Sequence, residues 1–149
     1  MKIKTIYILF IFIFPIISCK KENKINISEL DVYNSSLKET IDNFITNTKT
    51  YPIESRDDIL IYFIVDKNND TIVDFYNRNP YECDNLINVS FYKGKMIYFY
   101  SSKNLSNKIS TLIKIDGNDC RLICNQNMIN NEVDIIYQES YTFKNGIIK

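Results

Sequence analysis

A continuous apolar run in the middle of the chain constrains its fold most strongly. Residues 59–65 read ILIYFIV without a polar interruption, the pattern of a central strand that is buried on both faces of a sheet. Lys67-Asn68-Asn69-Asp70 follows as a turn signal, and Thr71 to Asn77 reads as a second strand. We therefore expect a β-hairpin at the centre of the domain.

Most of the remaining chain also reads as strands. Apolar and polar residues alternate from Ile87 to Tyr92 and from Ile109 to Ile115, with the two-residue period of a half-buried strand. Asn145-Gly146 is a strong hairpin signal that leads into a last short strand, residues 147–148. The other predicted strands are Met96 to Ser101, Cys120 to Cys124 and Val133 to Phe143.

One amphipathic helix precedes the strands. Ser28 with Asp31 resembles a capping box, and apolar side chains then recur at steps of three and four as far as Thr48, which makes one buried stripe. Pro52 ends the pattern. We predict an α+β domain in which this N-terminal helix packs on a curved antiparallel meander of about seven or eight strands. A small closed β-barrel with the helix at its mouth is the alternative.

Composition limits the chemistry that such a domain can perform. The chain has 149 residues, 18 Lys and Arg against 18 Asp and Glu, and no His. One domain is expected, and there is no basic excess to attract nucleic acid. The lack of His removes the commonest general base and metal ligand. The carboxylate pairs Asp57-Asp58 and Glu132 with Asp134 have no supporting pattern, so we expect neither an enzyme nor a cofactor.

The N-terminus reads as an export signal. Met1 to Lys4 is basic, and residues 5–17 are almost wholly apolar. This run is shorter than the about 20 residues of a spanning helix and fits the central part of a signal peptide. The following Ile16-Ile17-Ser18-Cys19 resembles the lipobox of bacterial lipoproteins. The resemblance implies that Cys19 is lipidated, that residues 1–18 are removed, and that the acyl chains hold the protein stably on a membrane.

The same resemblance implies how the chain is divided. Residues 1–18 would be the signal peptide, 19–27 the lipidated cysteine with a polar tether, and 28–149 a single α+β domain. No Asp directly follows Cys19; in enteric lipoproteins that Asp retains the protein at the inner membrane, so its absence favours the outer membrane. The expected location is the cell envelope, on either side of that membrane.

The mature chain would keep Cys83, Cys120 and Cys124, and export would place them in an oxidising compartment. In one extended strand Cys120 and Cys124 would lie ~13 Å apart, too far for a disulfide. Cys83 is therefore expected to pair with one of them and to leave one thiol over. Local closure of Cys120 with Cys124 in a turn or helix stays open as an alternative.

Two short motifs coincide with the first hairpin turn. Asp66 to Asp70 matches the start of a calcium loop, D-x-N-x-D, but Thr71 replaces the required Gly and Asn77 the required bidentate Glu. A turn explains these residues, and no metal site is expected. Asp70-Thr71-Ile72 resembles the D-[ST]-apolar sequon of bacterial O-glycosylation, which makes Thr71 a candidate site if the turn exposes it.

The chain contains 11 tyrosines. Tyrosine is enriched at protein interfaces and sugar-stacking surfaces, although it is also an ordinary strand residue. Together with the small size and the lack of a catalytic pattern, this favours a lipid-anchored protein-binding module, either an inhibitor or immunity-type protein or a subunit of an envelope complex. A small-ligand or carbohydrate-binding lipoprotein is the alternative, and an enzyme is favoured least. The tyrosines that cluster in predicted strands are Tyr92, Tyr98, Tyr100, Tyr137 and Tyr141.

Overall fold

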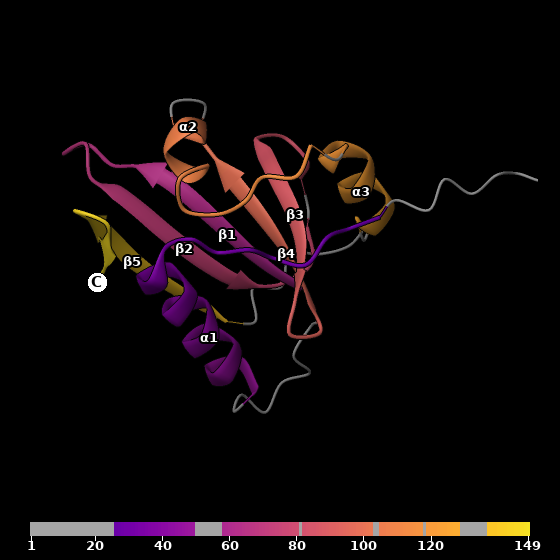
Figure 1. The fold of residues 1–149 in the computed structure, drawn as a ribbon, viewed down its shortest axis with the longest axis horizontal. Helices are drawn as coiled ribbons and strands as arrows, with labels where there is room; N and C mark the ends of the chain where they lie inside the picture. The colour runs from indigo at the N-terminus through magenta and orange to yellow at the C-terminus, as the bar shows by residue number, and fades with distance from the viewer. Residues whose placement is uncertain (1–25, 50–57, 81, 103–104, 118, 129–136) are drawn as a thin grey trace, which may run out of the picture.

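The computed structural model describes residues 26–49, 58–80, 82–102, 105–117, 119–128 and 137–149. In these ranges a sheet of six strands is accompanied by three helices (Figure 1), so the predicted α+β class is confirmed. The helices are α1 (Ser35–Lys49), α2 (Ser106–Ile109) and α3 (Cys120–Asn127). The strands are β1 (Asp58–Val65), β2 (Thr71–Asn77), β3 (Leu86–Tyr92), β4 (Lys95–Ser101), β5 (Gln138–Lys144) and β6 (Ile147–Ile148).

The sheet is mixed and open, with the strand order β3-β4-β1-β2-β5-β6. β1 and β4 run parallel, with Tyr62 opposite Tyr100, while the other described neighbours are antiparallel. The sheet is therefore neither the expected antiparallel meander nor a closed barrel, and the described residues contain six strands where seven or eight were expected. The β3–β4 hairpin docks on the far side of β1 instead of continuing beyond β2, and side-chain alternation carries no information about which strands become neighbours.

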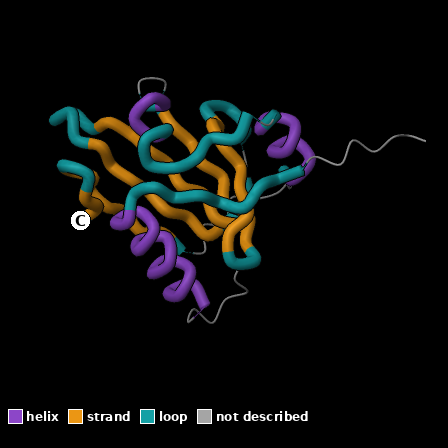
Figure 2. The backbone as a smooth tube through the Cα atoms, in the orientation of Figure 1, coloured by secondary structure: helices purple, strands orange, loops and turns teal. Residues whose placement is uncertain are grey.

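The first face of the sheet, which carries Ile59, Ile61 and Phe63 of β1, holds the larger core. The buried stripe of α1 packs there, with the ring of Phe44 5.3 Å from that of Phe75. Ile109 of α2 joins the same core. Figure 2 shows the segment before α1 crossing the strands on this side. The predicted packing of the helix on the sheet is therefore found.

The helix begins later than predicted. Ser28 and Leu30 are extended and bond to β3, with the Leu30 amide 2.8 Å from the Phe91 carbonyl oxygen and the Phe91 amide 2.9 Å from that of Ser28. Asn34 caps α1 instead, because its Oδ1 accepts from the Leu37 amide at 2.8 Å. Leu30 is buried in this extended segment. Its spacing from the helical stripe suits a helix equally well, so periodicity alone places the start too early.

Two segments predicted as strands are not strands of the sheet. The first, Ile109 to Ile115, contains the end of α2 and a turn, and its Ile113 forms an isolated bridge to Val32. The second, Cys120 to Cys124, lies in α3, where Asp119 caps the helix by accepting from the Leu122 amide at 3.1 Å. Short apolar patterns fit a strand or one face of a helix, and the cap at Asp119 is the signal that distinguishes them.

The C-terminal hairpin is confirmed in the described residues. Asn145 and Gly146 have φ values of 53° and 79°, as a two-residue type I′ turn requires. The start of α1 covers the edge of β6: the Ile148 amide donates to Ser36 Oγ at 2.9 Å. This contact occupies part of an edge that would otherwise be open to other strands. The first part of the predicted strand Val133 to Phe143 lies outside the described residues.

Candidate functional site

The second face of the sheet, opposite α1, is divided into two parts. Over β3 and β4 it is buried beneath α3, where Cys120 and Ile123 pack with Leu60, Val89 and Tyr98. Beyond α3, over β1, β2 and β5, the face carries a mixture of aromatic, aliphatic and polar side chains. We call this part the β1–β2–β5 patch; its residues are Tyr62, Ile64, Ile72, Asp74, Tyr76 and Ser140.

Strand register arranges the patch in rows. Tyr62 of β1 is opposite Asp74 of β2, and Asp74 is opposite Ser140 of β5. Ile64 and Ile72 are opposite each other in the next row. Ile64 is 41% exposed, Ser140 is exposed, and the other side chains of the patch are half-buried. Because facing residues share one side of a sheet, the patch presents an apolar row beside a polar and aromatic one.

Aromatic contacts hold the tyrosines of the patch in place. The Tyr62 ring stacks on that of Tyr100, with centroids 4.3 Å apart and an interplanar angle of 6°. Tyr76 meets the other side of Tyr62 edge-on, at 5.5 Å and 86°. Tyr100 is fully buried. The buried ring thus anchors Tyr62, which in turn contacts Tyr76, and this limits the entropy that the two half-buried rings would lose on binding a partner.

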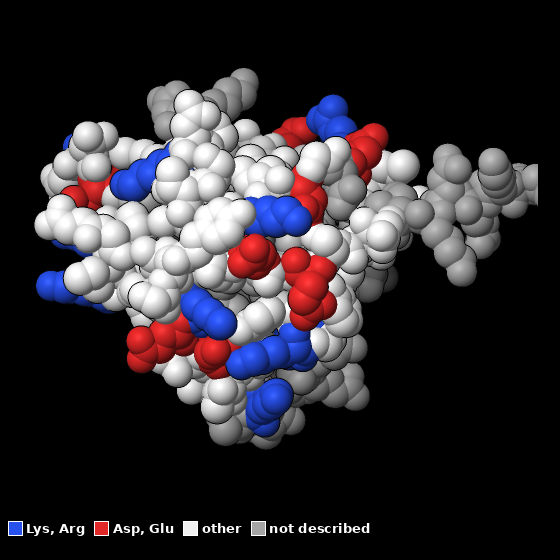
Figure 3. All heavy atoms as spheres, in the orientation of Figure 1, with Lys and Arg blue, Asp and Glu red and all other residues white. Residues whose placement is uncertain are grey.

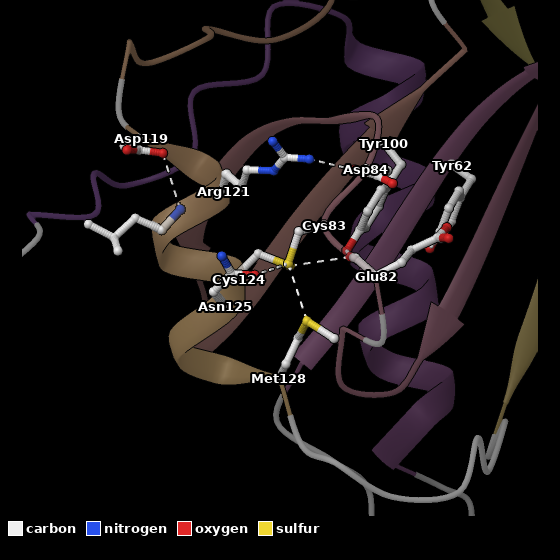
Figure 4. Close-up of a disulfide and its surroundings, with 11 residues drawn as sticks. Tyr62, Glu82, Cys83, Asp84, Tyr100, Asp119, Arg121, Cys124, Asn125 and Met128 are labelled. Carbon is white, nitrogen blue, oxygen red and sulfur yellow. Dashed lines mark hydrogen bonds and ion pairs between the residues drawn. A yellow bond between two sulfur atoms is a disulfide. The ribbon is translucent and has the colours of Figure 1, made fainter.

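A disulfide joins the patch to α3. The Tyr100 hydroxyl donates to the Glu82 carbonyl oxygen at 2.8 Å, and the Tyr62 hydroxyl donates to Glu82 Oε1 at 3.4 Å. The next residue, Cys83, is bonded to Cys124 of α3, with the two Cα atoms 5.7 Å apart. Figure 4 shows both tyrosines directed toward Glu82 beside this bond. The segment that receives the tyrosine hydroxyls is therefore fixed covalently to the helix.

The cysteine pairing agrees with the sequence prediction, although its geometric reason differs. Cys83 pairs with Cys124, and Cys120 is a buried free thiol. Cys120 and Cys124 lie one turn apart in α3 rather than in a strand. Burial raises the pKa of Cys120, which keeps the reactive thiolate scarce. Cys120 therefore behaves as a core residue.

Asp74 is the polar centre of the patch. Its Oδ2 accepts from the Tyr76 hydroxyl at 3.4 Å, whereas its Oδ1 is buried and has no hydrogen-bond partner among the described residues. A buried acceptor without a partner costs ~1–3 kcal/mol.

A second polar cluster lies on the first face, where α1 meets β5. Glu139 accepts hydrogen bonds from the hydroxyls of Tyr137 and Tyr141, and from Asn47 Nδ2 at 3.0 Å. Burial disfavours the charged form, but these bonds outweigh it and hold the pKa of Glu139 below its usual value. The Tyr137 ring lies 5.3 Å from that of Phe44. The carboxylate is already hydrogen-bonded to donors of this chain, one of them from α1, so its role is to fix the helix to the sheet.

The turn between β1 and β2 is a hydrogen-bonded hairpin loop. Asp66 Oδ1 accepts from the amides of Asn68 and Asp70 at 2.9 and 2.8 Å, and Asp70 pairs with Lys144 at 2.8 Å. In the described part of the chain no group of three or more His, Cys, Asp or Glu residues could hold a metal ion. These contacts support the turn interpretation.

Thr71 does not have the exposure that was expected at the edge of this turn. It is 4% exposed, and its hydroxyl accepts from Lys108 Nζ at 3.0 Å. The side chain of Lys108, from α2, lies over the start of β2, a contact that local sequence does not predict. O-glycosylation of Thr71 itself stays an untested prediction, and it would have to precede folding or displace Lys108.

The tyrosines singled out from the sequence have other roles. Tyr98 and Tyr100 are fully buried, and burial, with the nearby Asp58 carboxylate, raises the pKa of Tyr98. The Tyr92 hydroxyl donates to Asp42 of α1 at 3.0 Å. The patch tyrosines, Tyr62 and Tyr76, were not among them. Both occupy even-numbered positions of their strands, as the partly exposed residues of the patch do. The sequence alone does not show that this side of β1 and β2 stays partly exposed, because that depends on where α1 and α3 pack.

Several predicted features lie outside the described residues, namely the lipobox with Cys19 and the carboxylates Asp57, Glu132 and Asp134. No helix in the described ranges is long and apolar enough to span a membrane. On the side of the molecule that carries α1, Lys and Arg are interspersed with Asp and Glu (Figure 3).

No protein-family model, curated protein or solved structure matches this chain. Its function must therefore be inferred from its own residues.

Proposed function

We propose that this chain is a lipid-anchored protein of the bacterial cell envelope whose domain binds a partner protein and performs no chemistry. The β1–β2–β5 patch is the proposed contact surface. The observation that carries the proposal is the exposed Ile64 beside anchored tyrosines on the part of the second face that lies beyond α3. Such a protein would act as an inhibitor, as an immunity-type protein or as a subunit of an envelope complex.

The shape and composition of the patch favour a protein partner over a small ligand. Protein interfaces combine an apolar centre, in which aromatic residues are enriched, with a polar rim. Here Ile64 and Ile72 supply the apolar row, Tyr62 and Tyr76 the aromatic rings, and Ser140 a polar border. The sheet is open, so it does not close around these side chains as a barrel would.

Capture of the partner by matched variants tests this proposal. The tagged full chain, in mild detergent, would be the bait for lysates of its own cell and of competing bacteria. We expect one stoichiometric partner to bind wild type and to be lost with Ile64→Lys. Ile115→Lys is the matched control, because Ile115 is 36% exposed and lies outside the patch. Equal capture by both variants would exclude the patch, and no partner from either lysate would contradict a protein-binding role.

A carbohydrate ligand is the second candidate, and the unpartnered Asp74 Oδ1 favours it. Sugar hydroxyls donate hydrogen bonds, and sugar rings stack on aromatic side chains such as Tyr76. If the ligand is a carbohydrate, Asp74→Ala should abolish glycan binding, because it removes the oxygen that would accept from a sugar hydroxyl. A glycan array probed with wild type and this variant distinguishes the two candidates, since a protein partner held by the isoleucines would tolerate the change better.

The lipid anchor is a separate part of the proposal. The disulfide between Cys83 and Cys124 supports export to an oxidising compartment, and the lipobox supports attachment through Cys19, with the outer membrane as the proposed location. Cys19→Ser should release the protein from membranes, whereas Cys120→Ser should leave it bound. A Cys19→Ser protein that stays with the membrane fraction after a carbonate wash would contradict the anchor.

A further inference from the structure

The described chain enters the domain next to α3. Ile27 packs against the core that Cys120 and Ile123 of α3 form with the sheet, and the Phe91 amide bonds to the Ser28 carbonyl oxygen. Figure 1 shows this first segment beside α3, at one end of the long axis of the molecule. An attachment through the residues before Ile27 would therefore hold the domain at its α3 end.

The stretch of sequence between Cys19 and this point is short. Ile27 follows Cys19 by eight positions, so even a fully extended chain spans at most about 29 Å between them. A flexible chain of this length has a typical end-to-end distance of about 16 Å. Lys20, Lys21 and Lys24 lie in this stretch, and such basic residues are attracted to anionic headgroups. A lipid on Cys19 would thus keep Ile27 close to the membrane.

The opposite end of the molecule carries the β1–β2 turn. The β1–β2 turn lies at the far end of the long axis from α3, and the C-terminus lies on that side as well (Figure 1). Ile64 and Ile72 belong to the parts of β1 and β2 next to that turn. The apolar row of the patch is therefore at the end away from the point where the chain enters.

From these positions we infer that α3 faces the membrane surface and that the β1–β2 turn projects away from it. The inference rests on the proposed anchor at Cys19. The partner of α3 is a lipid headgroup surface, which the exposed Leu122, 44% accessible on the outer side of the helix, would contact. In this orientation the apolar row with Ile64 and Ile72 stays accessible from the space beside the membrane, where a protein partner would approach.

Fluorescence quenching from the membrane surface tests this orientation. The lipidated full chain would be reconstituted in vesicles whose headgroups carry a quencher, with a fluorophore on Gln126→Cys of α3 or on Lys67→Cys of the β1–β2 turn. Both positions are exposed. We expect several-fold stronger quenching at position 126 than at position 67. Equal quenching at the two positions, or stronger quenching at position 67, would overturn the orientation.

A lengthened tether provides the control. A flexible Gly-Ser insertion of about eight residues after Lys24 should roughly double the reach of the tether and weaken quenching at position 126. Unchanged quenching there would show that the tether does not hold α3 at the surface and would contradict the inference. Failure of the proposed anchor at Cys19 would be seen separately, because the wild-type protein would then not float with vesicles. That result would reject the anchor and the orientation together.

Discussion

Glu139 shows at the residue scale how one carboxylate fixes the helix to the sheet. It lies on β5 between two tyrosines of the same strand side, and Asn47 reaches it from the last turns of α1. Burial raises the pKa of this carboxyl, and the hydrogen bonds lower it by more. A pKa below that of the unfolded chain adds stability that is fully present above the unfolded value and is lost as pH falls through the folded value.

Glu139→Gln should therefore destabilise the protein at neutral pH by about 1–3 kcal/mol, the range for a hydrogen-bonded charged group. The difference from wild type should shrink as pH falls below the usual glutamate range, near 4. Urea denaturation across pH measures both. Glu39→Gln, at an exposed position of α1, should follow wild type. A Glu139→Gln protein as stable as wild type at neutral pH would show that the cluster contributes nothing.

At the scale of elements, α3 depends on a long-range crosslink. It has only eight residues, too few for a helix that is stable alone. A cap at Asp119, the packing of Ile123 and the bond from Cys124 to Cys83 hold it on the sheet. The disulfide joins residues 41 positions apart, so it removes considerable freedom from the unfolded chain.

Replacing Cys83 and Cys124 by Ser should lower the free energy of unfolding by about 3–4 kcal/mol, the entropic value for a loop of this length. Cys120→Ser should leave the disulfide between Cys83 and Cys124 intact. Mass spectrometry after alkylation of the unfolded, unreduced protein should find Cys120 modified and Cys83 and Cys124 still linked. Alkylation of all three would contradict the pairing, and an undiminished midpoint in the double variant would contradict its energetic role.

The β5–β6 turn allows a matched glycine test. Gly146 has a φ of +79° and open space around it, whereas Gly117 has comparable space and no positive φ. Gly146→Ala should cost about 1 kcal/mol, because a Cβ disfavours left-handed backbone. Gly117→Ala should be neutral or slightly stabilising. Equal urea midpoints for the two variants would contradict the prediction, because they would show that a Cβ at position 146 does not strain the turn.

At the scale of the whole molecule, one sheet carries two cores. β1 contributes Ile61 to the first face and Leu60 to the second. Neither core can persist without the strand that both share, so the domain should unfold as one unit.

Tyrosine fluorescence and far-UV circular dichroism should therefore report the same unfolding transition. Phe44→Ala, on the first face, and Ile123→Ala, on the second, should each move that single transition by about 2–5 kcal/mol. Two separate transitions, or a variant that moves only one signal, would show that α3 and its core unfold independently.

Local patterns in the sequence were sufficient for several elements. The run at Ile59 to Val65 became the central strand, and Asn145-Gly146 became the hairpin turn. Cys83 was matched with one of the two later cysteines. Each of these depends on chemistry within a few residues, or on a limit set by chain geometry. The prediction of strands at Ile109 to Ile115 and at Cys120 to Cys124 was wrong. The first segment is mainly a turn after α2, and the second is helical, because helix and strand patterns overlap over so few residues.

The sequence by itself determined the α+β class, the central strand, the turns and a residue set with no histidine for catalysis or metal binding. The tertiary structure decided that β4 lies parallel to β1, that Thr71 is covered by Lys108, and that Tyr62, Asp74 and Ile64 share one partly exposed face. Alternation sets which side of a strand a residue occupies. Which side is then buried depends on where α1 and α3 dock, and those contacts join residues far apart in the chain.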